Sequence, residues 1–307
     1  METSDLLRCI INLPVISASL ANEMLSGNFR SIFKGQGMEF DEARHYQAGD
    51  DIKAIDWNAS ARFGYPFIKM YREERELTIL ILIDISPSMH RADSSHELNS
   101  LSPYEQALIS ASLIAFSAEH TGQQVGAFFF DRDIEKVFPP RKGRKHIMSL
   151  IMAALQYQKN IVSRRANTGS NITSALSGAQ RLLKKRSFVV VISDFYSINW
   201  EKEMASLCRK HDCLAIRINS SQNTPFPGLI TLEDPETGIR IEAPAGLESF
   251  KESWENWHNE RTILWESQCR KSGAAFLDIT TGTDVPTALK KFFGSRTISQ
   301  YKQRKKI

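Results

Sequence analysis

Short buried strands and amphipathic helices alternate along most of this chain. The apolar run from Leu77 to Ile83 is short and rich in β-branched residues, which predicts a strand buried on both faces of a parallel sheet. The segment from Phe188 to Ile192 repeats this pattern. Further strands are expected at 125–130, 213–218 and 274–279, with a hairpin partner at 134–138, and helices at 103–120, 145–157, 171–185, 200–211, 247–272 and 285–293. This alternation predicts an α/β fold with a doubly wound, mostly parallel sheet flanked by helices.

The remaining segments have other patterns. Residues 1–30 suggest one or two helices broken at Pro14, and residues 31–76 are punctuated by glycine, which favours short strands and turns. Residues 229–242 are expected to form a hairpin inserted at the edge of the sheet. We therefore expect an N-terminal segment (1–76) packing on the core, a main domain (77–295) with its hairpin insertion, and a basic C-terminal tail (296–307).

Composition narrows the class of protein. The chain has 307 residues, 42% hydrophobic and 24% charged, which is ordinary for a soluble globular protein. Its net charge of +4 comes partly from the tail, and no basic stripe is interleaved with aromatic residues, so nucleic-acid binding is not expected. The apolar segment 10–20 is too short to span a membrane. Four scattered cysteines (Cys9, Cys208, Cys213, Cys269) predict no disulfide framework and a reduced, cytoplasmic location.

Oxygen-bearing side chains follow two of the buried strands. Asp84, Ser86 and Ser88 end the first strand, and Asp194 ends another. Ser170 stands just before a predicted helix. Because parallel strands end at one edge of a sheet, these five oxygen donors are expected to meet there, as a set suited to Mg²⁺, Mn²⁺ or Ca²⁺. The alternative is that the same residues only cap helices and shape turns.

This set resembles the metal-ion-dependent adhesion site of von Willebrand factor A domains. The resemblance implies a site of five residues, namely Asp84, Ser86 and Ser88 in an Asp-x-Ser-x-Ser motif, together with Ser170 and Asp194. That family usually has threonine where Ser170 stands, and serine lacks the methyl group that restricts the rotamer.

A second resemblance covers nearly the whole chain. Six motifs are similar to those of the prokaryotic family called domain of unknown function fifty-eight. They are Gly35-Gln-Gly37-Met-Glu39-Phe40, Arg44-x-Tyr46-x-x-Gly49-Asp50-Asp51, Ile55-Asp56-Trp57, Ala61-Arg62, Glu73-Glu74-Arg75-Glu76 and the later 232–238 hairpin. The resemblance implies a von Willebrand A-type domain preceded by this signature segment. It also implies a chaperone-like or adaptor partner of MoxR-type AAA+ ATPases, and of other von Willebrand A proteins. Because the five residues leave a coordination position of the cation open, we expect a non-enzymatic binding module in which the metal bridges to a Glu or Asp of the partner. Many members carry transmembrane helices, and none is expected here.

Two other functions are weaker alternatives. A Mg²⁺-dependent phosphohydrolase of haloacid-dehalogenase type would need a second aspartate at position 86, where this chain has serine. A structural adaptor with an empty metal site is the other alternative.

Several further residues are expected to be structural. Gly35-x-Gly37 is read as a tight turn, and Asp50 and Asp51 as part of another turn. Arg44, Asp50, Asp56 and Arg62 are expected to form charge-assisted hydrogen bonds. Trp57 is expected to pack in the interior; for Trp254, Trp257 and Trp265 the core is the default, with at least one exposed for a partner.

Overall fold

The computed structural model describes residues 10, 13–14, 16–21, 39–47, 50, 55–72, 77–90, 101–159, 170–219, 228–233 and 239–304. Contacts within the chain divide it into two units, one made of residues 1–29 and 77–307 and the other of residues 30–76. Segment 1–29 therefore belongs with the α/β unit rather than with the segment that follows it.

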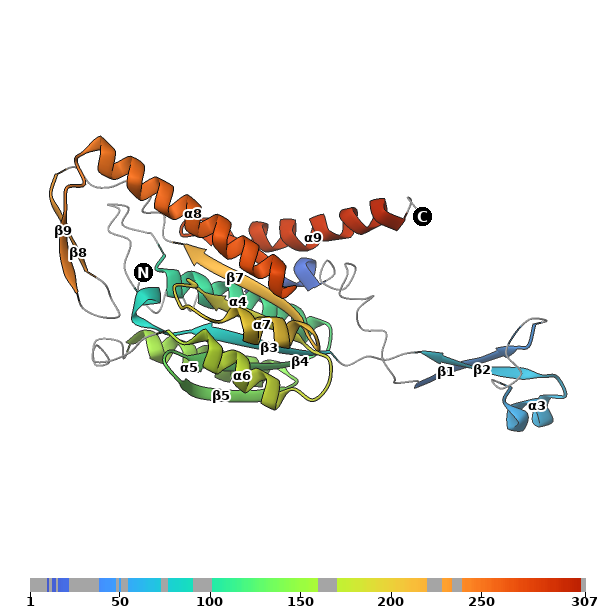
Figure 1. Cartoon of the computed structure of the whole chain (residues 1–307). Coiled ribbons are helices and arrows are strands. Elements are labelled where there is room, and N and C mark those ends of the chain that lie inside the picture. The colour runs from blue at the N-terminus through green and yellow to red at the C-terminus, as the bar shows by residue number, and fades with distance from the viewer. Residues whose placement is uncertain are drawn as a thin grey trace. The chain divides into compact units, whose positions relative to one another are not determined.

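A six-stranded sheet forms the centre of the larger unit. Its strand order is β10-β7-β6-β3-β4-β5, and every pair is parallel except the antiparallel pair β4–β5. The strands are β3 (Thr78–Asp84), β4 (Gln124–Phe130), β5 (Ile134–Arg141), β6 (Phe188–Ser193), β7 (Asp212–Asn219) and β10 (Ala275–Thr280). The predicted α/β fold with a mostly parallel central sheet is confirmed (Figure 1).

Helices cover both faces of this sheet. They are α4 (Pro103–His120), α5 (Arg144–Lys159), α6 (Ile172–Leu182), α7 (Glu201–Cys208), α8 (Glu248–Ser272) and α9 (Val285–Arg304). Leu80 and Leu82 face a core shared with α6, α7 and α8. Since side chains alternate along a strand, Ile79, Ile81 and Ile83 face the other side, which α4 covers. Burial on both faces explains why these strands contain few polar residues.

Helix α4 is the most deeply buried helix of the described fold. Its residues from Pro103 to Ala118 are all buried, and Ser102 caps its first turn in a reciprocal arrangement with Glu105. The Tyr104 hydroxyl donates to the Ala154 carbonyl of α5 at 2.8 Å. The N-terminal segment contacts the same helix, because Ser117 Oγ of α4 donates a hydrogen bond to the Ser17 carbonyl at 3.1 Å.

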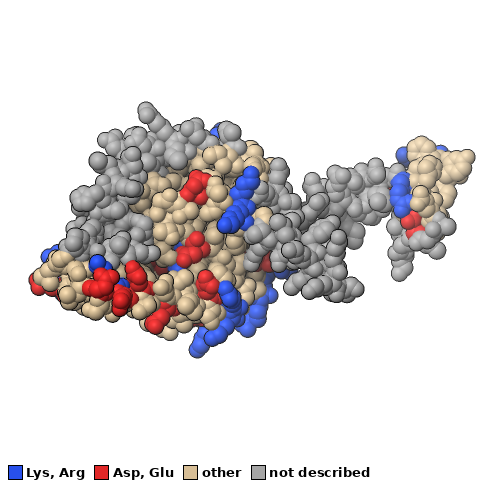
Figure 2. Space-filling model, turned by 90° about the horizontal axis from the view of Figure 1, so that it is seen from above, with Lys and Arg blue, Asp and Glu red and all other residues tan. Residues whose placement is uncertain are grey.

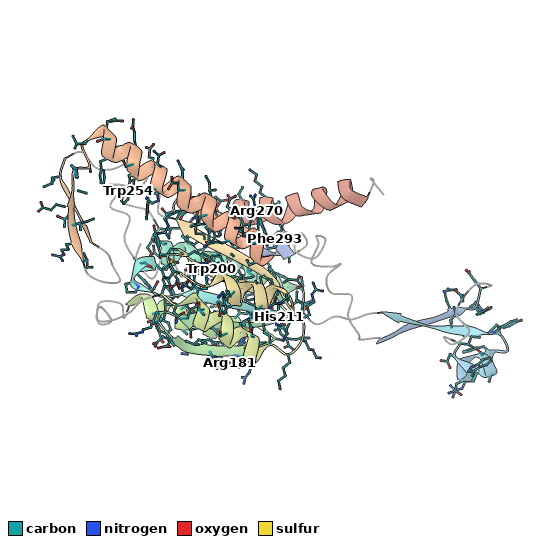
Figure 3. The ribbon with its side chains drawn as sticks, in the orientation of Figure 1. Arg181, Trp200, His211, Trp254, Arg270 and Phe293 are labelled. Carbon is teal, nitrogen blue, oxygen red and sulfur yellow. The ribbon has the colours of Figure 1, made fainter. Side chains whose placement is uncertain are left out.

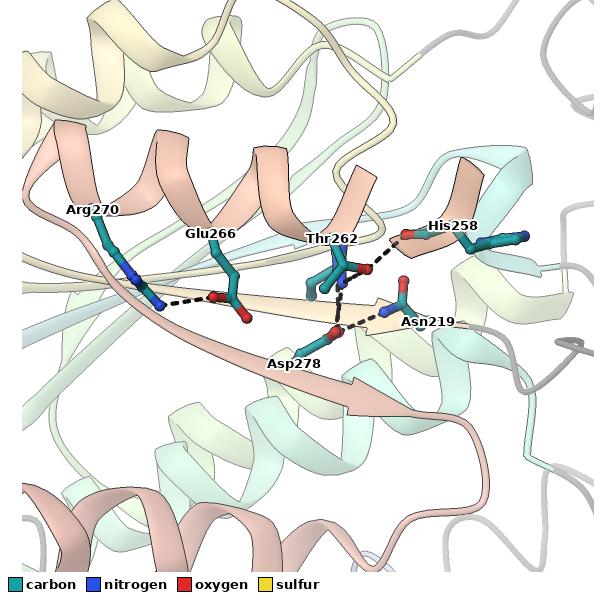
Figure 4. Close-up of polar contacts among 7 residues, drawn as sticks. Asn219, His258, Thr262, Glu266, Arg270 and Asp278 are labelled. Atoms are coloured by element: carbon teal, nitrogen blue, oxygen red, sulfur yellow. Dashed lines mark hydrogen bonds and ion pairs between the residues drawn. The ribbon is translucent and has the colours of Figure 1, made fainter. Parts of the chain in front are cut away.

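Helix α8 is fastened to the sheet by a polar cluster on its inner side. Asp278 of β10 accepts hydrogen bonds from Arg217 and Asn219 of β7, and Arg217 also donates to Thr262 of α8 at 2.9 Å (Figure 4). The Arg217 guanidinium lies 4.4 Å from the Trp265 ring centroid. This cluster satisfies a buried charge and holds α8 over β7 and β10.

The outer side of α8 carries charges of both signs. Glu248 lies in its first turn, whereas Arg270 and Lys271 lie in its last turn, an arrangement that complements the helix dipole. Seen from above, acidic and basic side chains both lie on this face, in several places next to each other (Figure 2). The hairpin of β8 (Ile230–Glu233) and β9 (Arg240–Ala243) adjoins the N-terminal end of α8 (Figure 1).

The smaller unit contains β1 (Glu39–His45), α3 (Trp57–Phe63) and β2 (Phe67–Arg72). β1 and β2 pair antiparallel, and Arg44 forms an ion pair with Asp50 at 2.7 Å, which agrees with the charge-assisted contacts expected for this segment. Trp57 was expected to pack in the interior, but it is 69% exposed, because α3 is a short helix at the surface of its unit. Gly35, Gly37 and Asp51 lie outside the described residues.

Two further expectations differ from the structure. Among the described residues, the strands of the 229–242 hairpin pair with each other and do not extend the edge of the six-stranded sheet. Helix α9 continues to Arg304, past the expected end at Phe293, and the described part of the basic tail is therefore helical. Pro14 itself is helical, as are the described residues 13 and 16–21. None of the described helices combines the length and the apolar composition that a membrane crossing needs.

Candidate metal centre

Asp84 lies at the centre of a hydrogen-bonded cluster at the carboxyl edge of the sheet. Its side chain is fully buried, and its Oδ1 accepts from the backbone N–H of Ser86 at 2.9 Å. Its Oδ2 accepts from Ser170 Oγ at 2.7 Å and from Ser193 Oγ at 2.6 Å. Three segments that are far apart in sequence therefore meet at one carboxylate.

The turn after β3 positions the two nearer hydroxyl groups. The bond between the Asp84 side chain and the Ser86 N–H bends the chain, and the short 3₁₀ helix η2 (Pro87–His90) follows. Ser86 Oγ lies 3.0 Å from Ser88 Oγ. Ser86 is buried and Ser88 is half-buried, so the hydroxyl pair leads from the carboxylate towards solvent.

The loop after β6 holds the second carboxylate. Asp194 Oδ1 accepts from the Tyr196 N–H at 3.0 Å, and Ser193 Oγ accepts from the Phe195 N–H at 3.0 Å. Phe195 has a φ of 54°, a left-handed conformation that is unfavourable for a bulky residue. Its ring is held in the core against Trp200 (Figure 3) and Trp265, with centroids 5.3 and 5.5 Å away. Packing thus maintains a strained backbone beside the site.

The electrostatics of the cluster favour a bound cation. Burial, followed by the negative charge of Asp194, raises the pKa of Asp84 to about 6, although hydrogen bonds from Ser193, Ser86 and Ser170 act in the opposite direction. Nearby, burial lowers the pKa of His90 to about 3, so this imidazole is neutral and stacks on Tyr104 at 4.1 Å. Two close carboxylates without a cationic histidine are costly unless a proton or a metal ion balances them.

The chemistry of the donors fits a hard divalent cation. Every donor is a carboxylate or hydroxyl oxygen, the type that Mg²⁺, Mn²⁺ and Ca²⁺ prefer. The hydroxyl groups that donate to Asp84 keep lone pairs with which to bind a cation. Among the described residues, no group of three or more His, Cys, Asp or Glu side chains is placed to hold a metal, which leaves no zinc-type alternative in that part of the chain.

The five residues expected at the site are all found at this edge of the sheet. Asp84, Ser86, Ser88 and Ser170 are connected by the hydrogen bonds described above, and Asp194 acts on Asp84 through its charge.

Sequence reasoning missed Ser193, although the parallel register pairs Ile83 with Ile192 and so places Ser193 beside Asp84. It also missed Asp131, a buried acid at the end of β4 whose Oδ1 accepts from the Asp133 N–H at 3.3 Å.

A third residue that sequence reasoning missed lies at the rim of the site. The guanidinium of Arg261 on α8 is 4.0 Å from the Tyr196 ring centroid, and its Nη2 is 3.5 Å from the Phe195 carbonyl oxygen. No local motif marks this residue, because α8 is separated from β6 by more than fifty residues of chain.

Comparison with known proteins assigns no activity to this arrangement. The profile of a family described as "Protein of unknown function DUF58" matches residues 42–262. Uncharacterized proteins of Mycobacterium bovis and Mycobacterium tuberculosis are each 27% identical over 281 residues, which is 89% of this chain and 84% of the relative. Among solved structures, the pilus adhesin SpaC of Lactobacillus rhamnosus GG matches 74% of this chain and 31% of its own, with 9% identity and a TM-score of 0.41. Similarity at that level supports no conclusion about fold or function.

Proposed function

Since this chain belongs to the DUF58 family of proteins of unknown function, we propose its function from the chemistry of the site. The proposal is a non-enzymatic protein-binding module that uses a divalent cation to engage an acidic residue of a partner. In this proposal residues 77–295 are a von Willebrand factor A-type domain, and Asp84, Ser86, Ser88, Ser170 and Asp194 hold the ion.

One observation carries the proposal. A single buried carboxylate, Asp84, collects hydroxyl groups from the segment before α6 and from the end of β6. When bound, the ion would supply a positive centre that attracts the carboxylate of a partner. The residues of this chain orient the hydroxyl oxygens and leave Ser88 and Ser170 partly accessible from outside. Serine at position 170 keeps the oxygen donor, so the departure from threonine weakens the site without removing a donor.

The adaptor role comes from the family resemblance. It supports a MoxR-type AAA+ ATPase, acting in the cytoplasm, as the first partner to test, with other von Willebrand A proteins as further candidates. The phosphohydrolase alternative has less support, because Ser86 stands where that chemistry needs a second carboxylic acid and its Oγ contacts the hydroxyl of Ser88.

Substitution of Asp84 tests the proposal directly. We expect Asp84→Ala and Ser170→Ala to lose Mg²⁺ binding in titration calorimetry, and to lose Mg²⁺-dependent capture of a co-expressed MoxR-type ATPase. Asp212→Asn is the matched control, because Asp212 lies at the opposite edge of the sheet and pairs with Arg186. Circular dichroism should show that the variants keep their secondary structure.

Each alternative predicts a different result. Capture that persists in Asp84→Ala or in chelator would overturn metal bridging, and the absence of Mg²⁺ and Mn²⁺ binding by the wild type would favour a structural adaptor. Release of phosphate from a panel of phosphate esters would favour the enzyme.

A further inference from the structure

Arg261 places a second positive charge at the rim of the proposed metal site. Its guanidinium carbon lies 4.0 Å from the Tyr196 ring centroid and 5.0 Å from that of Trp257, one turn earlier on α8. Its Nη2 lies 3.5 Å from the carbonyl oxygen of Phe195, the residue that follows Asp194 in the loop after β6. Arg261 is half-buried, so the aromatic contacts hold it in position while part of it remains accessible.

Little of the hydrogen-bonding capacity of Arg261 is used. A guanidinium has five N–H donors in its plane, and stacking on aromatic rings occupies its faces rather than those donors. Within the described part of the chain, Arg261 donates one hydrogen bond, the long contact of 3.5 Å to the Phe195 carbonyl. By contrast, Arg217 of β7, which lies under α8, is buried and donates three hydrogen bonds, two to Asp278 and one to Thr262. Arg261 is therefore available to a ligand and Arg217 is not.

The surroundings of Arg261 suit a protein segment. Tyr196 and Ile198, on the same loop as Asp194, are 44% and 78% exposed, and Trp257 is 43% exposed. A divalent cation would balance the charges of Asp84 and Asp194, which would leave the charge of Arg261 to attract an anion. An acidic group reaching Arg261 would lie beside these apolar side chains, and a peptide can present both kinds of contact.

We infer that Arg261 is a second anion-binding point, so that the partner presents two acidic groups, one at the cation and one at Arg261, on a segment that also covers Tyr196 and Ile198. This inference rests on the proposed metal-dependent binding function. It adds a chemical definition of the partner, which is an acidic segment with at least two carboxylates and an apolar residue near them. A planar guanidinium favours a carboxylate that accepts two parallel hydrogen bonds.

Selection from a random peptide display library tests the inference on the full-length protein. The baits are the wild type, Arg261→Gln, Arg261→Lys, Asp84→Ala and Arg270→Gln, each used with Mg²⁺ and with chelator. Arg270→Gln is the matched control, since Arg270 lies on the same helix (Figure 3), is exposed and pairs with Glu266 at 2.8 Å. Thermal unfolding of each variant separates loss of binding from loss of structure.

With Mg²⁺, the wild type and Arg270→Gln should select peptides that contain two acidic residues. Arg261→Gln should select peptides with one acidic residue and should bind a two-acid peptide about tenfold to a hundredfold more weakly, as expected for loss of a hydrogen bond between charged groups. Arg261→Lys should recover only part of this affinity, because lysine lacks the planar pair of donors. Changing the second acid of the peptide to its amide should weaken the wild type and leave Arg261→Gln unaffected.

The two proposals fail in different ways. Metal-dependent selection of single-acid peptides, or two-acid peptides that bind Arg261→Gln as tightly as the wild type, would overturn the role of Arg261 alone. Absence of any Mg²⁺-dependent difference between the wild type and Asp84→Ala would overturn the metal-dependent function, and with it this inference.

Discussion

At the scale of single residues, the site depends on one buried carboxylate. Asp84 and its two following serines could be predicted from sequence, because an apolar strand ending in Asp-x-Ser-x-Ser is a local pattern. Ser193 could have been found from the register of two parallel strands. Arg261 could not, because its place at the rim depends on how α8 packs against the loop after β6.

The raised pKa of Asp84 predicts a pH dependence of metal binding. Burial and the charge of Asp194 raise this pKa to about 6, so the folded protein takes up a proton at Asp84 as the pH falls through that value. The proton competes with the cation, and we expect Mn²⁺ affinity, measured by titration calorimetry, to be lower at about pH 5.5 than at about pH 7.5.

The metal-free protein should show the opposite linkage in its stability. A carboxyl group with a raised pKa stabilises the fold while it is protonated, and this contribution is lost as the pH rises from about 4 to about 6. In urea unfolding with chelator, the free energy of unfolding of Asp84→Asn should fall less between these pH values than that of the wild type. Asp212→Asn should show the same fall as the wild type.

The metal-binding prediction has its own test. Equal Mn²⁺ affinity at about pH 5.5 and about pH 7.5 would contradict a titrating ligand at Asp84.

At the scale of elements, most helices and strands follow from the hydrophobic pattern, and their ends depend on tertiary contacts. The predicted α4 range agrees with the structure because Ser102 and Glu105 form a capping box that is visible in the sequence. The α9 range was too short, because its charged second half has no apolar periodicity to mark it. The 229–242 hairpin was recognised, but its pairing partner could not be read from its own residues.

Close packing of α6 on the sheet predicts the effect of a methyl group. A Cβ atom at Gly178 would lie 2.3 Å from Ile134 Cδ1 of β5 and 3.1 Å from Phe128 Cε2 of β4. We expect Gly178→Ala to lower the free energy of unfolding by about 1 kcal/mol, measured by urea denaturation, because crowding against Ile134 and Phe128 outweighs the gain in helix propensity.

A double-mutant cycle identifies the cause of this loss. Ile134→Val removes the Cδ1 atom, so the double variant should be more stable than the sum of the two single effects implies. Additive effects would show that the contact with Ile134 is not the cause of the loss at Gly178.

At the scale of the whole molecule, the chain forms one α/β unit interrupted by a smaller one. The metal-site edge could be predicted, because parallel strands connected by helices end on the same side of a sheet. Residues 1–29 belong to the same unit as residues 77–307. This could not be predicted from sequence, because it depends on tertiary contacts such as that between Ser17 and Ser117. The described residues of the smaller unit form their own sheet and helix.

This division predicts that the α/β unit tolerates removal of the smaller one. A chain in which a flexible glycine-serine linker replaces residues 30–76 should unfold cooperatively and bind Mn²⁺ as the full chain does, because the proposed ligands all lie between 84 and 194. Calorimetry and urea denaturation measure both properties. Loss of cooperative unfolding would show that the larger unit requires residues 30–76.

The docking of the N-terminal segment on α4 also has a consequence for synthesis. Ser17 leaves the ribosome a hundred residues before Ser117, its hydrogen-bond partner on α4. The same segment carries Ile10, Leu13 and Leu20, which are buried in the finished fold, and it cannot complete its hydrogen bond to α4 while the smaller unit and β3 are being made. This segment is therefore translated before the smaller unit but completed only after α4 has been made, and chaperones can cover its apolar side chains during that interval.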